Sequence, residues 1–157
     1  MDILNSEFLL FIKCAHQNNL DYLLIGGFAV NYHGYNRNTD DMDVWLKPTN
    51  ENKQAFINTL VCMKYSEREV TPLYDEDFTK PFVGTIGSAD AEIDILTVVH
   101  HAISYEEAEK GKHVFEVEEG LFMNFVSYEI LKEMKFRAHR DKDLFDIARL
   151  EEIRNKK

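Results

Sequence analysis

The sequence predicts an α/β fold in which a mixed β-sheet is flanked by helices. Two patterns indicate it: short apolar runs bounded by turn residues, which are typical of strands, and longer segments with apolar residues every three or four positions, which are typical of helices. Both kinds of segment recur along the chain, an order that packs helices against a sheet. At 157 residues the chain suits one core rather than two, so we expect a single domain over residues 1–157.

The first half of the chain divides into helices and strands at recognisable caps and turns. Asn and Ser cap helices, and glycine pairs permit tight turns. The expected elements are a helix from Asn5 or Ser6 to about Asn18, a strand over 22–25, a helix over 28–35, a strand over 43–46 that Pro48 stops, and a helix starting at Thr49 or Asn50. Residues 66–80 are polar, and we expect mostly loop there.

The second half predicts two hairpins and the last helices. Its expected elements are strands over 82–86 and 92–98 joined by a turn at 87–90, a short helix after the capping box Ser104-x-x-Glu107, strands over 113–117 and 121–125, a helix from Ser127 to about His139, and a last helix from Asp141 or Lys142. The C-terminal helices, about residues 127–157, should pack on the rest of the domain.

Composition and charge limit the functional classes. A net charge of −10 argues against strong non-specific binding to nucleic acid, although one local basic patch could still bind it. No apolar run approaches the ~20 residues of a membrane helix, and we read no signal peptide at the N-terminus. Cys14 and Cys62 lie far apart without metal-ligand spacing. We expect buried free thiols, no membrane association and a reduced, cytoplasmic setting.

Three carboxylates are the strongest candidates for chemistry. Asp41 and Asp43 flank one apolar residue and lead into a strand, so alternation would project them side by side. Adjacent carboxylates repel unless a cation lies between them, and Mg²⁺ prefers a few carboxylates plus substrate phosphates. Asp94 lies in similar surroundings and is the third expected ligand, with Glu92 a weaker candidate on the same face. The alternatives are a solvated acidic edge and an edge-strand charge.

A glycine pair and two polar residues precede these acids. Gly26 and Gly27 could let a triphosphate approach the backbone at a helix start, or could form a tight turn without a ligand. Arg37 could pair with a phosphate, with Asp41 or in a structural salt bridge, and Thr39 could cap or orient the loop.

These motifs resemble a known family. The pattern Gly-Gly-x-Ala-x-x-x-His-Gly-x-x-Arg-x-Thr-x-Asp-x-Asp runs from Gly26 to Asp43, and it is followed by Glu-x-Asp-Ile-Leu at 92–96 and Lys-x-x-x-x-Arg-x-Lys-Asp-x-x-Asp at 135–146. Together they resemble the minimal nucleotidyltransferases of the DNA polymerase β superfamily, in particular the group related to the AbiEii abortive-infection toxins. The resemblance implies a nucleotidyltransferase sheet flanked by helices. Many of those relatives have Gly-Ser at the turn, where this chain has Gly-Gly followed by Phe28.

The single basic stretch of this acidic chain lies between residues 132 and 142. If the helix continues through it, Lys135, His139 and Lys142 share one face, where they could receive triphosphate oxygens or an RNA backbone. A solvated charged face is the alternative. Asp143 and Asp146 should orient these cations or lock the last two helices together.

Two functional hypotheses follow. The first is an enzyme that transfers a nucleoside monophosphate from an NTP to an acceptor hydroxyl of RNA, protein or a small molecule, using two Mg²⁺ ions on Asp41, Asp43 and Asp94, for which Mn²⁺ can substitute. The second is a non-catalytic nucleotide-binding or toxin–antitoxin interaction module. The acceptor, with tRNA and a partner protein as candidates, and a homodimer or antitoxin partner are left open by the sequence.

Overall fold

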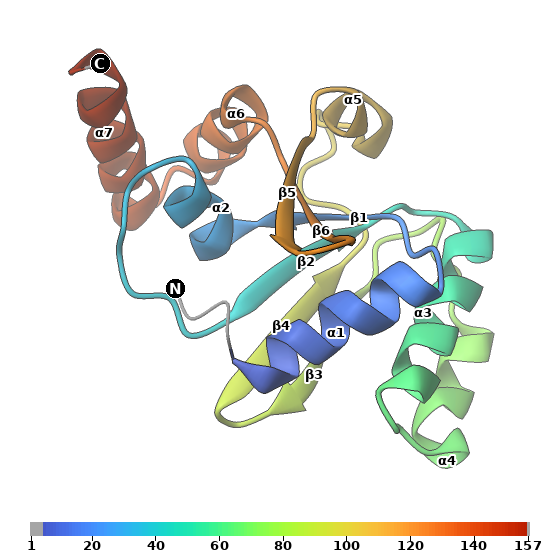
Figure 1. Ribbon diagram of the computed structural model, residues 1–157. Coiled ribbons are helices and arrows are strands. Elements are labelled where there is room, and N and C mark those ends of the chain that lie inside the picture. The colour runs from blue at the N-terminus through green and yellow to red at the C-terminus, as the bar shows by residue number, and fades with distance from the viewer. Residues whose placement is uncertain (1–4, 157) are drawn as a thin grey trace.

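The computed structural model describes residues 5–156, which form a six-stranded mixed sheet flanked by helices (Figure 1). The elements up to residue 75 are α1 (Ser6–Gln17), β1 (Tyr22–Ile25), α2 (Gly26–Tyr32), β2 (Met42–Leu46), α3 (Asn50–Cys62), α4 (Glu67–Val70) and the 3-10 helix η1 (Thr71–Asp75). The elements after it are β3 (Val83–Ser88), β4 (Ala91–Leu96), α5 (Tyr105–Lys110), β5 (His113–Glu118), β6 (Leu121–Phe125), α6 (Tyr128–Ala138) and α7 (Asp141–Asn155). The predicted fold class is therefore confirmed.

The strand order is β3-β4-β2-β1-β6-β5. β2 lies antiparallel to β1 and parallel to β4, and β1 lies parallel to β6. The two predicted hairpins, β3–β4 and β5–β6, form the two edges of the sheet. β1 and β2 consequently lie in the middle, where residues 22–25 are buried on both faces as their continuous apolar run requires.

Strand alternation divides the sheet into two faces. Met42, Val44, Ile93 and Ile95 share one face and are fully buried, beneath the layer of α1, α3 and α4 (Figure 1). Asp43, Trp45, Asp94 and Leu96 share the opposite face, which lies on the side of α5 and α6. The main core thus lies between the sheet and the layer of α1, α3 and α4, and the two candidate carboxylates Asp43 and Asp94 lie on the opposite face.

The two C-terminal helices pack against each other in an antiparallel hairpin, with α6 next to α2. Ser127 caps α6 through its side chain, as the sequence predicts, by accepting a hydrogen bond from the backbone N–H of Ile130. His139 has left-handed backbone angles and ends α6, and α7 then begins at Asp141. Across residues 5–156, no helix has the length and apolar character needed to cross a bilayer.

Residues 66–80, predicted as mostly loop, contain α4 and η1. The capping box that starts α4 explains the difference: the Ser66 hydroxyl accepts from the backbone of Glu69, and the Glu69 carboxylate accepts from the backbone of Ser66. Pro72 then fits the first turn of η1, where its missing N–H costs nothing.

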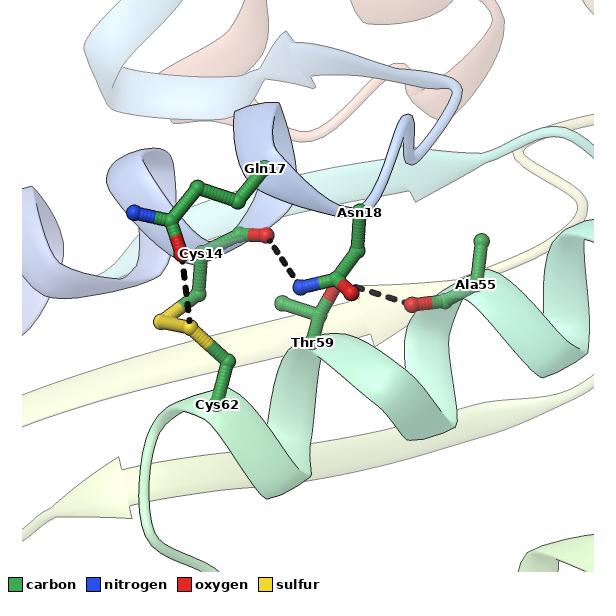
Figure 2. Close-up of a disulfide and its surroundings, with 6 residues drawn as sticks. All are labelled: Cys14, Gln17, Asn18, Ala55, Thr59 and Cys62. Carbon is green, nitrogen blue, oxygen red and sulfur yellow. Dashed lines mark hydrogen bonds between the residues drawn. A yellow bond between two sulfur atoms is a disulfide. The ribbon is translucent and has the colours of Figure 1, made fainter.

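The prediction of two free thiols is wrong: Cys14 and Cys62 form a disulfide that joins α1 to α3 (Figure 2). Their Cα atoms lie 5.7 Å apart although 48 positions separate them in sequence. The two cysteines lie on helices that pack against each other, which spacing along the chain does not reveal. The cytoplasmic setting stays a prediction.

Candidate active site

Two of the three candidate carboxylates are neighbours across parallel strands. Asp43 on β2 is in register with Asp94 on β4, and both side chains project from the same face of the sheet. Next in the same row is Thr85 of the edge strand β3, whose hydroxyl donates to Asp94 Oδ1 at 2.9 Å. The sheet therefore aligns a hydroxyl and two carboxylates across three adjacent strands.

The electrostatic environment of this pair disfavours a second negative charge. Burial, then the charge of Asp94 and a hydrogen bond with its side chain, and then the charge of Asp41 raise the pKa of Asp43 to about 6, while Lys135 acts in the opposite direction. A carboxylate whose pKa is raised by other carboxylates is one that a bound cation would favour in its charged form. The donor set therefore suits a hard divalent cation such as Mg²⁺.

Strand alternation was expected to project Asp41 beside Asp43, but Asp41 lies outside the strand. β2 begins at Met42, so Asp41 lies in the preceding loop, half-buried, where its backbone carbonyl accepts a hydrogen bond from the Thr39 hydroxyl at 3.3 Å. In the described residues, no three acidic, histidine or cysteine side chains already converge at metal-binding distances. The arrangement that the structure does show is the Asp43–Asp94 pair with Asp41 near enough to act on Asp43 through its charge.

Gly26 and Gly27 are required by close contacts with the candidate site. Gly26 has φ +64°, and a Cβ there would collide with the Asp43 carboxylate. A Cβ on Gly27 would collide with the Thr39 side chain. The glycine pair thus lets the start of α2 lie directly against one carboxylate and against the loop that carries Asp41.

A buried ionic network lies beside the carboxylate pair and joins three segments. Lys135 Nζ on α6 lies 3.1 Å from Asp146 Oδ2 and 3.4 Å from Asp143 Oδ1, both on α7. Arg37 Nη2, from the loop before β2, lies 3.1 Å from the same Asp146 oxygen. Of the alternatives for Arg37, the structure therefore shows a salt bridge with Asp146, and its Nε is buried without a hydrogen-bond partner in the described residues. Asp143 and Asp146 lock the last two helices together.

Lys135 and Lys142 do not share a helical face as predicted. The left-handed conformation of His139 interrupts the helix between them, and Lys142 is exposed in the first turn of α7. Arg140, to which the sequence analysis gave no role of its own, is instead bound to Asp143 through two side-chain hydrogen bonds, Nε to Oδ2 at 2.6 Å and Nη2 to Oδ1 at 3.1 Å. Burial favours the neutral form of Asp143, but these bonds and the charge of Lys135 outweigh it and lower the pKa of that carboxyl.

A cavity of about 230 Å³ brings these groups together. Its polar lining consists of Gly26, Asp43, Lys135, Arg140 and Asp143. Its apolar lining consists of Ile25, Leu96, Val98, Val99, Leu131, Met134 and Ala138. A molecule with an anionic part and an apolar part would match both linings.

Several other sequence candidates lie outside this cavity. Glu92 is exposed. His33, the histidine of the pattern that runs from Gly26 to Asp43, is buried with its Nε2 2.8 Å from the carbonyl oxygen of Val126, a structural position. Thr85 was not predicted, and Arg140 was predicted only as a member of the basic stretch and of the pattern at 135–146, without a role of its own. Strand pairing could have indicated Thr85, and the three-dimensional position of the α6–α7 turn is what brings Arg140 to the cavity.

The comparisons with known proteins support the fold. No protein-family model matches the chain, and no curated protein sequence matches it. The crystal structure of the lincosamide antibiotic adenylyltransferase LnuA, bound to lincomycin, is similar to this chain at a TM-score of 0.52 and 12% sequence identity. The match covers 94% of this chain and 96% of that one. The likeness therefore extends over nearly the whole length of both proteins, and the mixed sheet with its helices is a fold found in a nucleotidyltransferase.

Proposed function

We propose that this protein is a metal-dependent nucleotidyltransferase, which moves a nucleoside monophosphate from an NTP to an acceptor hydroxyl and releases pyrophosphate. The observation that carries the proposal is the Asp43–Asp94 pair, set in register on parallel strands beside a glycine turn and a cationic cavity wall. The residues come from the motifs that resemble the DNA polymerase β superfamily, and we keep the resemblance to its AbiEii-related group as part of this proposal.

Each carboxylate has a proposed role. Asp41, Asp43 and Asp94 would hold two Mg²⁺ ions, or Mn²⁺ in their place, which when bound lower the pKa of the acceptor hydroxyl and neutralise charge on the transferring phosphoryl group. Asp94 would accept the proton of the attacking hydroxyl, since it lies nearest the open edge of the sheet. Thr85 donates to Asp94 Oδ1 and so orients this carboxylate.

The nucleotide would lie in the 230 Å³ cavity. Its phosphates would contact Lys135 and the backbone of Gly26 and Gly27, because free N–H groups and cations favour anions. Arg37 and Thr39 would support this end by fixing the loop that carries Asp41. Lys142 was also expected at the triphosphate, but it is exposed and does not line this cavity, so we propose no phosphate contact for it. The nucleoside would cover the apolar lining near Leu96 and Val98.

The charge distribution favours a small or protein acceptor over RNA. Attacking and leaving oxygens lie roughly in line in phosphoryl transfer, so an acceptor must approach from the side opposite the phosphate-binding cations. That side is formed by β3 and β4, which carry only neutral and acidic residues. An RNA backbone needs Lys or Arg at such a surface. The lincomycin-bound neighbour makes a small hydroxyl compound of that kind our first acceptor to test.

A non-catalytic nucleotide-binding or toxin–antitoxin module is the alternative, and one experiment separates it from the enzyme. The protein is incubated with each of the four NTPs labelled at the α-phosphate, with Mg²⁺, and with lincomycin, total RNA or lysate protein as the acceptor. We expect label to move to one acceptor class in the wild type and not in Asp43→Asn. Nucleotide binding without transfer to any acceptor would support the alternative, including a role with an antitoxin partner or as a homodimer.

A further inference from the structure

Arg140 lies where the cationic wall of the cavity meets solvent. It follows His139, which ends α6, and directly precedes α7, and it lines the same cavity as Gly26, Asp43 and Lys135. Its side chain remains 62% exposed although the carboxylate that holds it is 1% exposed. One edge of the guanidinium is therefore fixed in the protein while the rest stays accessible to a ligand.

Arg140 has N–H donors that are still available to bind a ligand. A guanidinium has five N–H donors. Asp143 accepts from Nε and from Nη2, and its Oδ2 also accepts from the Arg140 backbone N–H at 3.2 Å. The remaining three N–H groups, including both on Nη1, make no hydrogen bond to any residue between 5 and 156. The fork held by Asp143 is thus oriented in advance, which reduces the entropy lost when it binds a second anion.

Lys135 is less free to bind phosphate than its charge suggests. Its side chain is 8% exposed, and its ammonium group already contacts Asp143 and Asp146. It neutralises the two buried carboxylates, one of which fixes Arg140. The network therefore places Arg140 as its accessible cation at the cavity.

We propose that Arg140 binds the β- and γ-phosphates of the NTP, and so the pyrophosphate that leaves; this assignment rests on the nucleotidyl transfer proposed above. Guanidinium groups match phosphate oxygens in pairs, whereas an ammonium group acts as a point charge. Arg140 contacts Asp143 at one edge and would present the other to the phosphates. Binding there would leave the α-phosphorus near Asp43, which lines the same cavity.

Affinities for a non-hydrolysable NTP and for the matching NMP test this assignment in the presence of Mg²⁺. Hydrogen bonds to charged groups contribute about 1.5–3 kcal/mol, which is roughly a ten- to hundredfold change in affinity. We expect Arg140→Gln to weaken NTP binding by about tenfold or more and NMP binding much less. Lys142→Gln removes the same charge two residues away at an exposed site and is the matched control, for which we expect little change in either affinity.

Arg140→Lys separates loss of phosphate binding from a general structural effect of the substitution. It keeps a positive charge next to Asp143 and should fold, which its melting temperature checks. Because it lacks the second edge of the guanidinium, we expect an intermediate loss of affinity for the NTP and none for the NMP. Equal losses for NTP and NMP in the Arg140 variants, or a larger loss in Lys142→Gln, would overturn the assignment while nucleotide binding by the wild type stands. If the wild type binds none of the four NTP analogues, the proposed function itself fails.

Discussion

Replacing Asp43 by asparagine should stabilise the metal-free protein at neutral pH while it removes the proposed activity. The folded protein holds this carboxyl beside Asp94 and Asp41 in a half-buried site, which raises its pKa from 3.8 to about 6. Each pKa unit corresponds to 1.36 kcal/mol, so ionised Asp43 destabilises the folded state by about 3 kcal/mol above pH 6. Asparagine keeps the shape and removes the charge.

The sign of the effect depends on pH in a defined way. Because the folded pKa is raised, the native state holds the proton more tightly than the unfolded chain does. The favourable contribution of protonated Asp43 is complete below pH 3.8 and is lost as the pH rises through about 6. We therefore expect Asp43→Asn to gain up to about 3 kcal/mol over wild type at pH 7.5 and to gain little at pH 4.

Urea unfolding in the presence of EDTA measures this difference at the two pH values. Asp40→Asn is the control, because Asp40 is exposed and is not among the groups that raise the pKa of Asp43. A loss of stability in Asp43→Asn at pH 7.5, or the same gain at both pH values, would refute the electrostatic reasoning. A gain in the Asp40 control of equal size would show that general charge repulsion in this acidic chain is responsible.

Three further predictions concern the turn, the disulfide and the ligands. Gly26→Ala should lower the free energy of unfolding by about 1–2 kcal/mol, because residue 26 has a left-handed backbone, and it should reduce transfer by displacing the Asp43 carboxylate. Gly27→Ala, whose new methyl group would contact Thr39, should impair transfer less. Unfolding curves and transfer rates check both variants, and an unaffected Gly26→Ala would contradict the contact with Asp43. Reduction of the Cys14–Cys62 disulfide should lower the melting temperature, because closing a loop of this length contributes about 4 kcal/mol to the free energy of unfolding in the chain-entropy model. Cys14→Ser is the control and should have the same melting temperature with and without reductant. Mg²⁺ or Mn²⁺ with a non-hydrolysable NTP should raise the melting temperature more than Mg²⁺ alone, and no shift with any of the four NTPs would favour the non-catalytic module.

Much of the fold followed from local patterns in the sequence. Asn5 and Ser127 cap the helices predicted to begin there, and strand alternation correctly placed Asp43 and Asp94 away from the core. These features depend on neighbours along the chain. The register of Asp43 with Asp94 depends instead on a parallel pairing of β2 with β4, which alternation alone does not specify.

The features that the sequence did not reveal depend on long-range packing or on single backbone angles. Cys14 and Cys62 meet only because α1 packs on α3. His139 turns left-handed and separates Lys142 from Lys135, a conformation for which a histidine gives little local signal. Thr85 faces Asp94 because Ser88 pairs with Ala91 around a two-residue loop; a four-residue loop over 87–90 would have placed Val83 there.

The proton acceptor and the carboxylate pair are tested most directly by pyrophosphate release coupled to label transfer. Wild type, Asp94→Asn and Asp43→Asn are compared with α-labelled NTP, Mg²⁺ and the acceptor class that the wild type labels. The proposed mechanism predicts one pyrophosphate for each labelled acceptor in the wild type, and neither product in the two variants, which should still fold. Undiminished transfer by either variant would contradict the assignment of the site to Asp43 and Asp94.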